Sequence, residues 1–280
     1  MKNLFQLLIY GLLISSCTLQ KVQKTNLNDN IIQVARTYYL ELLPERSPSN
    51  FKVVHNDGKR AVVSLVHTSP AIDKGKIKAS AILTNFYMYL KKENTAWKVT
   101  SSSGGLQTGM RMSGDYARTY SAKEIVEQTE RKNKVQGVPE YRVERMRNQY
   151  ILATSLDSVL INHFNKNKFN FETLKEALQT LNPRTKNRYY ADHFPKEDML
   201  KHFNKALIEY VDYIVLPDEV SENSGCNGQD CFTLTLAFSP PFYKVGYFYL
   251  NEPERVPQMS AKEYLIVHPL GDSWYFFRIN

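Results

Sequence analysis

The chain has 280 residues, 42% of them hydrophobic, and its 36 basic and 28 acidic side chains give a formal charge of +8. This length suits one large domain or two ordinary ones. The longest apolar run is only about ten residues, whereas a membrane-spanning helix needs roughly 20, so the composition excludes a protein built of membrane-spanning helices.

The N-terminus carries the order of residues that is typical of a secretory signal. Lys2 is followed by an apolar segment from Leu4 to Ile14 and then by the small residues Ser15 and Ser16. A charge, a short apolar core and small residues before a cleavage point form such a signal. We therefore predict that residues 1–16 are removed.

The residues around the predicted cleavage point resemble the lipobox of bacterial lipoproteins. Ile14, Ser15 and Ser16 precede Cys17, with isoleucine where leucine is more common. The resemblance implies that the sulfur of Cys17 receives a diacylglyceryl group and that its new amine is acylated, which would anchor the chain stably in a membrane. The polar residues 17–27 then form a tether. The alternative is an ordinary signal followed by a free cysteine.

A lipoprotein location changes what the positive charge indicates. Removal of Lys2 leaves a charge of +7, and in the envelope the available anions are lipid phosphates, lipopolysaccharide or wall polymers, with a solvated surface as the alternative. We expect no nucleic-acid partner. Thr18 is not the aspartate that marks inner-membrane retention in some bacteria, so the resemblance implies the outer membrane of the bacterial cell envelope.

A first α+β module is predicted over residues 28–103, and it begins with a helix. Asn28 or Asp29 can cap this helix, and Pro44 ends it. Between them the apolar residues follow helical spacing, and these are Ile31, Val34, Ala35, Tyr38 and Leu42.

Alternating residues predict that an antiparallel meander follows this helix. Residues 51–54 and 61–68 flank an Asn-Asp-Gly turn, which indicates a hairpin. Residues 79–90 form a long strand with one buried face, and Trp97 lies on the closing strand.

Residues 101–114 are rich in glycine and serine, and residues 104–120 are predicted to be a linker before a second α+β module at 121–280. Ser121 and Glu124 have the spacing of a capping box. Apolar stripes predict that helices fill most of residues 121–216, the last of them running from Pro195 to about residue 215.

Cys226 and Cys231 lie in the stretch SGCNGQDC. Two cysteines this close in an exported chain favour a disulfide, because the compartment is oxidising. A zinc site is the alternative, but it needs two further ligands and no histidine lies close in sequence. We therefore predict a disulfide, and neither a metal nor a cofactor.

After the cysteines the sequence alternates with a period of two, most regularly over residues 232–238. Residues 243–250, 263–267 and 274–279 continue an antiparallel sheet. The fold class expected is α+β, with helices packed on antiparallel sheets, in two modules that each run from helix to meander.

Both modules end on a tryptophan-bearing strand, at Trp97 and Trp274, and a helix packed on such a sheet resembles the cystatin-like and nuclear-transport-factor-2-like folds. That resemblance implies pockets used by enzymes, ligand carriers and docking domains alike, so it does not choose among them.

No catalytic motif is present in the sequence, and no catalytic residue is assigned. The pair Ser49 and Lys52 matches a serine–lysine spacing by chance, since companion motifs are missing. Asp192 and His193 are the best acid–base candidates by composition, although a helix start there would also explain the polarity. His163 on an apolar stripe indicates a hydrogen-bonded core histidine.

Two aromatic groups are candidates for ligand contact. The densest basic and aromatic cluster is the candidate site for an anionic group or polymer, and it comprises Arg184, Lys186, Arg188, Tyr189 and Tyr190. Tyr243, Tyr247 and Tyr249 share one face of a strand, which is either buried on both sides or an aromatic platform for sugars or a partner protein.

These observations predict a lipid-anchored envelope protein with a non-catalytic binding or scaffolding role toward a partner protein or an envelope polymer. The alternative is a pocket-bearing small-ligand carrier, or a hydrolase or isomerase, of the nuclear-transport-factor-2-like type.

Overall fold

The computed structural model describes residues 28–43, 49–73, 76–104, 108–181, 188–194, 197–213, 231–239 and 243–279. They form two compact units. The first comprises the chain up to Val66 together with Tyr87–Ser102, and the second comprises His67–Phe86 together with Ser103–Asn280. The described part of the chain contains no helix that is long and apolar enough to cross a membrane.

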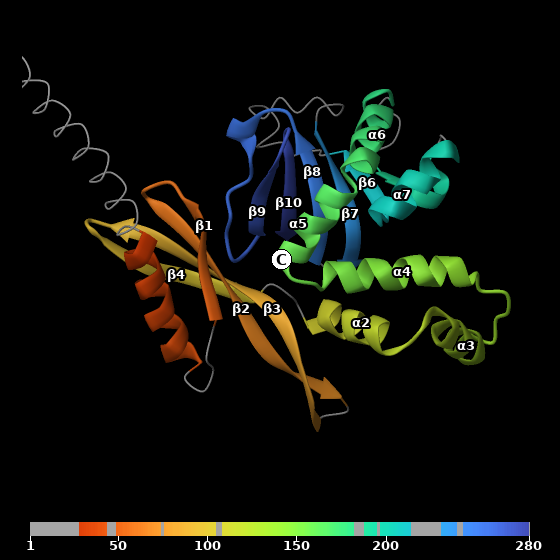
Figure 1. The fold of residues 1–280 in the computed structure, drawn as a ribbon, viewed down its shortest axis with the longest axis horizontal. Coiled ribbons are helices and arrows are strands. Elements are labelled where there is room, and N and C mark those ends of the chain that lie inside the picture. Colours follow the sequence, from red (N-terminus) through yellow and green to blue (C-terminus); the bar gives the residue numbers. More distant parts are fainter. Residues whose placement is uncertain are drawn as a thin grey trace, which may run out of the picture. The chain divides into compact units, whose positions relative to one another are not determined.

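The first unit is a helix followed by a four-stranded sheet (Figure 1). The helix covers residues 28–42. The strands are β1 (Ser49–Asn56), β2 (Arg60–Asp73), β3 (Lys76–Glu93) and β4 (Ala96–Gly104), and they lie in the sheet in chain order. The predicted helix and meander are therefore present, although β2 and β3 reach beyond Val66 into the second unit.

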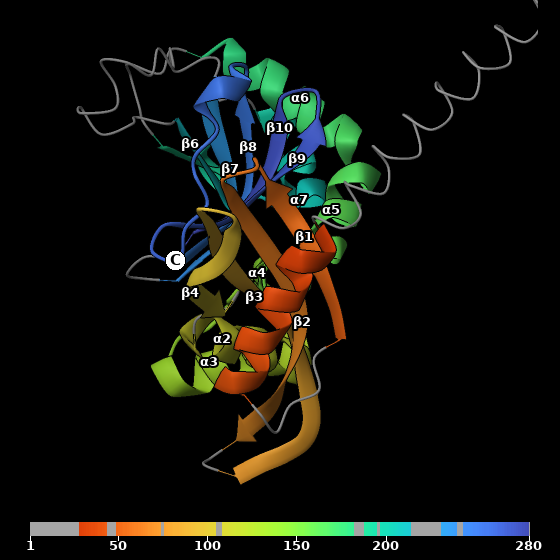
Figure 2. The ribbon, with the colours of Figure 1, turned by 90° about the vertical axis from the view of Figure 1, so that its left-hand side faces the viewer.

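The core of the first unit lies between this helix and the sheet (Figure 2). The helix buries Ile31, Ala35 and Tyr39, whereas Leu42 of the predicted stripe is exposed. Tyr39 meets Phe51 of β1 edge-on, with ring centroids 6.2 Å apart. Near the C-terminal end of the helix, the residue that packs against the sheet is therefore Tyr39, whose ring contacts β1.

The hairpin turn between β1 and β2 is held by Asp57. One carboxylate oxygen accepts the amide N–H groups of Lys59 (2.9 Å) and Arg60 (2.6 Å). Burial alone would raise the pKa of Asp57, but these amide groups and the Arg60 side chain lower it to about 2. Gly58 has φ +83°, a conformation that other residues rarely adopt.

The second unit combines a helical half with a six-stranded sheet. Its strands lie in the order β5-β6-β7-β8-β10-β9, and each strand is antiparallel to its neighbours. The helices are α2 (Thr108–Thr119), α3 (Ala122–Asn133), α4 (Glu140–Ala153), α5 (Asp157–Lys166), α6 (Lys168–Gln179) and α7 (Leu200–Ala206). The strands are β5 (Arg188–Tyr190), β6 (Tyr210–Tyr213), β7 (Cys231–Ser239), β8 (Tyr243–Leu250), β9 (Tyr264–Gly271) and β10 (Trp274–Ile279), and the 3₁₀ turns are η1 (Ala191–His193), η2 (Glu197–Met199) and η3 (Pro253–Arg255).

The α+β class is confirmed, and two local expectations were wrong. Helix α2 occupies residues that we expected to form a linker, and it packs against α4 despite its glycines. Strand β6 replaces the end of the helix predicted from Pro195, since Tyr210 and Val211 pair with Thr235 and Leu234 of β7. Sheet pairing outweighs the local helical spacing there.

The sheet of the second unit is buried on both faces. On one face, Tyr247 packs against Phe164 of α5 and Phe171 of α6, with ring centroids 5.5 and 4.8 Å apart, and its hydroxyl donates to the carbonyl of Leu160 (2.8 Å). On the other face, Phe248 packs with Cys231 and Phe277, among other residues. Strand β8 is therefore a two-sided buried strand, and Tyr247 and Tyr249 form no exposed platform.

Arg278 holds the junction between α4 and α5. Its side chain is 1% exposed. It donates to the Asp157 carboxylate (2.9 Å) and to the carbonyl oxygens of Ala153 (2.8 Å) and Ser155 (2.6 Å). It thus satisfies carbonyls at the end of α4 that have no helical partner. At the start of α5, the amide of Asp157 donates to the side chain of Asn85 (3.0 Å), a residue of β3 in the second unit.

Candidate functional site

The predicted basic and aromatic cluster is divided by the alternation of β5. Arg184 and Lys186 lie outside the described residues. Tyr189 is buried, while Arg188 and Tyr190, two residues apart, share the other face of the strand. Of the described members, Arg188 and Tyr190 therefore share one face of the strand, and Tyr189 lies on the other.

Arg188 is bound to Asp212 on the neighbouring strand. Its Nε and Nη2 atoms donate to the two carboxylate oxygens at 2.5 and 3.0 Å. The guanidinium lies 4.4 Å from the centroid of the Tyr210 ring, and Lys244 of β8 approaches the same carboxylate at 3.3 Å. Hydrogen bonding to Asp212 raises the pKa of Arg188 further. Its charge is thus matched, and it fixes the β5 edge to β6.

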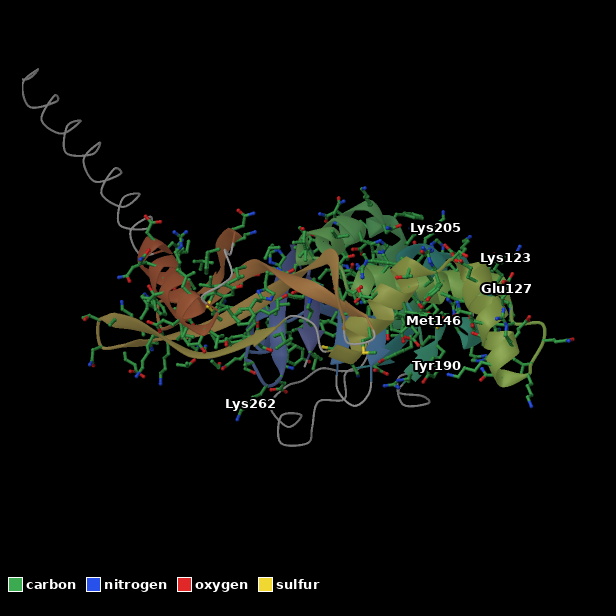
Figure 3. All side chains as sticks on the ribbon, turned by 90° about the horizontal axis from the view of Figure 1, so that it is seen from below. Lys123, Glu127, Met146, Tyr190, Lys205 and Lys262 are labelled. Carbon is green, nitrogen blue, oxygen red and sulfur yellow. The ribbon has the colours of Figure 1, made fainter. Side chains whose placement is uncertain are left out.

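Tyr190 lies on the wall of a pocket at this edge of the sheet. The pocket has a volume of about 400 Å³ and is lined by Arg145, Tyr190, Ala191, Asp192, His193 and Glu209. We call it the edge pocket. The Tyr190 side chain is 43% exposed, and Figure 3 labels it on the surface of the second unit. Its ring contacts that of Tyr210, with the centroids 5.7 Å apart.

Backbone hydrogen bonds bring the lining residues together. The amide of Ala191 donates to the carbonyl of Glu209 (3.0 Å), and the amide of Glu209 donates to the carbonyl of Thr235 (2.8 Å). These bonds continue the sheet ladder beyond β5 and β6, so Glu209 is held beside the η1 turn. Its backbone position is set by the sheet and needs no ligand.

Asp192 is held by two arginines of α4. The Nη1 atom of Arg145 donates to its Oδ1 atom at 2.6 Å and also contacts Asn204 of α7 at 3.1 Å, and Arg142 approaches Oδ2 at 3.6 Å. The hydrogen bond from Arg145 lowers the pKa of Asp192, against the effect of burial. The two arginines therefore favour the charged form of Asp192 and fix the orientation of its carboxylate.

Glu209 has the opposite environment. Burial raises the pKa of its carboxyl, and the charges of Arg145 and Arg188 only partly oppose that effect. Within the part of the chain that the structure describes, no hydrogen bond or ion pair reaches the Glu209 carboxylate. Two carboxyl groups of one pocket thus have pKa values shifted in opposite directions.

Asp192 and His193, the acid–base candidates of the sequence, do not form a hydrogen-bonded pair in the described part of the chain. Both residues line the edge pocket, but among the described residues Asp192 bonds to arginines and not to the imidazole. Sequence reasoning missed Arg145 and Glu209, which come from segments 47 and 17 residues away from Asp192. Neither residue has a local sequence signal of its role. Glu209 also lies within the stretch that we predicted to be helical.

A second cavity, of about 420 Å³, lies in the first unit between the helix at 28–42 and β4. Its lining includes Val34, Tyr38, Trp97 and Val99. The charged residues Glu41 and Lys98 also line it. The cavity could therefore enclose an apolar group, but it has few polar groups that could orient a ligand.

The remaining candidates are placed as follows. Cys17 and Cys226 lie outside the described residues. Cys231, 2% exposed, begins β7 and packs with Phe248, so the disulfide stays a prediction. His163 is hydrogen-bonded to the carbonyl of Ala206 (3.1 Å), and burial lowers its pKa, as expected of a structural histidine.

No group of three histidine, cysteine or acidic side chains among the described residues could hold a metal ion. In comparisons with protein-family models, curated proteins and solved structures, the chain matches none of them. The edge pocket is therefore interpreted from its own geometry.

Proposed function

We propose that this protein is a lipid-anchored protein of the bacterial envelope that binds a saccharide polymer, without catalysis, through the edge pocket. The lipobox residues that end at Cys17 support the anchor, and Thr18 supports the outer membrane. The observation that carries the binding role is the exposed Tyr190 ring on the wall of a polar pocket.

The chemistry of the pocket suits a sugar ring. A sugar presents C–H groups on one face, which pack against an aromatic ring, and hydroxyl groups at its rim, which bond to carboxylates and guanidinium groups. Tyr190 supplies the ring, and the Arg145–Asp192 pair supplies both a donor and an acceptor in fixed positions. Because Tyr210 and the sheet hold Tyr190, little ordering is needed on binding.

The binding role is favoured over catalysis by the state of Asp192. Two arginines stabilise its charged form and lower its pKa, so it is a weak base at neutral pH. In the described part of the chain it does not orient His193.

A second candidate is the small-ligand carrier, or the hydrolase or isomerase, of the nuclear-transport-factor-2-like type. It is favoured by the convergence of Asp192, His193 and Glu209 on one pocket. A pair of carboxyl groups with separated pKa values can serve as base and acid. Products released from a saccharide by the wild type, but not by Glu209→Gln, would favour this candidate over simple binding.

Binding is tested with the full chain in detergent and a panel of isolated envelope saccharides. Tyr190→Ala is expected to weaken binding about tenfold, the loss expected of one aromatic contact. Phe169→Ala is the matched control, since Phe169 is an exposed ring on α6 (75%) outside the edge pocket. Equal binding by wild type and Tyr190→Ala would contradict the proposed site.

The anchor is tested in cells by labelling with a fatty acid. Cys17→Ala is expected to lose both the label and the membrane fraction, because no other residue of the lipobox can carry the diacylglyceryl group. Ser15→Ala keeps a small residue and is expected to retain both. Membrane fractionation of the Cys17→Ala variant at the wild-type level would refute lipidation.

A further inference from the structure

The charges at the edge pocket are matched except at one residue. Arg145 is the one cation in the described lining, and it is bound to Asp192 and Asn204. Arg188, the other cation that acts on Glu209, is bound to Asp212. Glu209 is therefore the carboxylate left without a partner in the described part of this neighbourhood.

A half-buried carboxylate without a partner is costly, because water solvates it only in part. A ligand that brings a hydrogen-bond donor to Glu209 removes this cost, and a positively charged donor does so most strongly. An anionic group would instead meet the unmatched negative charge of Glu209. The site therefore selects a cationic donor, although the chain as a whole is basic.

The number of carboxylate oxygens still available in the pocket decides which kind of cation can bind. A metal ion would require several oxygen ligands, and Asp192 is already held by Arg145 and Arg142. A single carboxylate suits an ammonium group, which needs one strong acceptor and can donate its other hydrogens to neighbouring oxygens. Tyr190 on the same pocket supplies the surface for the ring that carries this group.

We propose that the edge pocket recognises a saccharide with a free amino group, and that the ammonium binds to the carboxylate of Glu209 while the sugar ring packs on Tyr190. This proposal rests on the proposed function and specifies its ligand.

The test compares three oligosaccharides of equal length: a glucosamine oligomer, its N-acetylated form and a neutral glucose oligomer. Binding to the full chain is measured by calorimetry at a pH between the pKa of a carboxyl group and that of the sugar amine. The wild type is expected to bind the glucosamine oligomer at least about tenfold more tightly than the other two, as one charge-assisted hydrogen bond allows.

Glu209→Gln keeps the size of the side chain and is expected to remove this preference while it retains weak binding of all three oligomers. Glu127→Gln, on the exposed surface of α3 (Figure 3), is the control and is expected to keep the preference. Thermal unfolding of each variant verifies its fold, and the comparison of ligands on the wild type does not depend on any variant.

The two proposals fail in different ways. If the wild type binds all three oligomers equally, or if Glu209→Gln keeps the preference, the amine assignment is overturned and saccharide binding stands. If no saccharide binds, the proposed function is overturned and the amine assignment falls with it. Tighter binding of a lysine oligomer than of the glucosamine oligomer would place the ammonium on a peptide and overturn the saccharide.

Discussion

The centre of the six-stranded sheet and its β5 edge use polar groups in opposite ways. At the centre, Arg278 has three hydrogen-bond partners, and the Tyr247 hydroxyl donates to the carbonyl of Leu160. At the edge, Tyr190 is exposed and Glu209 has no described partner. The centre therefore serves stability, and the edge keeps interactions available for a ligand.

Two phenylalanines of α6 give the largest expected effect. Phe171→Ala is expected to lower the free energy of unfolding by about 3–5 kcal/mol, because a fully buried ring leaves a cavity. Phe169→Ala, two residues away and exposed, is expected to change it by less than about 0.5 kcal/mol. Urea unfolding measures both, and similar losses for the two variants would show that the ring cluster does not form the core.

Arg278 gives the next effect. Arg278→Ala is expected to cost about 3 kcal/mol, because it leaves the Asp157 carboxylate and two carbonyl groups without this donor. Arg142→Ala, which removes an exposed guanidinium near Asp192, is expected to cost less than about 1 kcal/mol. Urea unfolding measures the stability of both variants, and equal stabilities would contradict this prediction.

Asp192 and Asp57 predict how stability changes in acid. Both have pKa values lowered in the folded state, so their contributions are present above the pKa of an unfolded aspartate and are lost as the pH falls through the folded values, about 2 for Asp57. Arg145→Gln is expected to flatten the acid part of the stability profile, because it removes the main group that lowers the pKa of Asp192. Stability measured against pH in wild type and variant tests this, and identical profiles would refute it.

Glu209 is expected to have the smallest effect on the free energy of unfolding. Its pH dependence has the opposite sign to that of Asp192 and Asp57. Burial raises its pKa, so the folded state holds a proton more tightly, and stability falls as the pH rises from the unfolded to the folded pKa. Glu209→Gln is expected to raise the free energy of unfolding at neutral pH by about 1 kcal/mol or less, and to leave it unchanged in acid. A loss of stability at neutral pH would show that the carboxylate has a structural partner.

A gain of stability on removing Glu209 would also distinguish a binding group from a structural one. A residue that lowers the stability of the free protein is retained when a ligand supplies the missing interaction. Glu127→Gln, on the exposed face of α3, serves as the reference for the loss of one negative charge.

The fold was predictable wherever a local pattern determined it. The alternation of residues 232–238 predicted β7, and the spacing of Ser121 and Glu124 predicted the capping box that begins α3. Strand β6 was not predictable, because its residues fit helical spacing and only the pairing of Tyr210 with Thr235 determines the strand.

The candidate site was predictable only in part. Tyr190 and Asp192 were found from composition, since they lie in a dense run of polar and aromatic residues. Arg145 and Glu209 were not, because their roles depend on long-range pairing: the α4 helix brings Arg145 to Asp192, and the sheet ladder brings Glu209 to Ala191. The sequence also indicated an anionic ligand, whereas Arg188 is already bound to Asp212.

The Arg188–Asp212 bond has one more consequence, for the behaviour of crowded copies. Strand β5 is an edge strand of only three residues, and its Arg188 side chain is hydrogen-bonded to Asp212 of the neighbouring strand β6. Long, flat edge strands invite another chain to add a strand, and short edges with charged side chains discourage it. Copies of the chain at high local concentration can therefore face one another at this edge without joining their sheets.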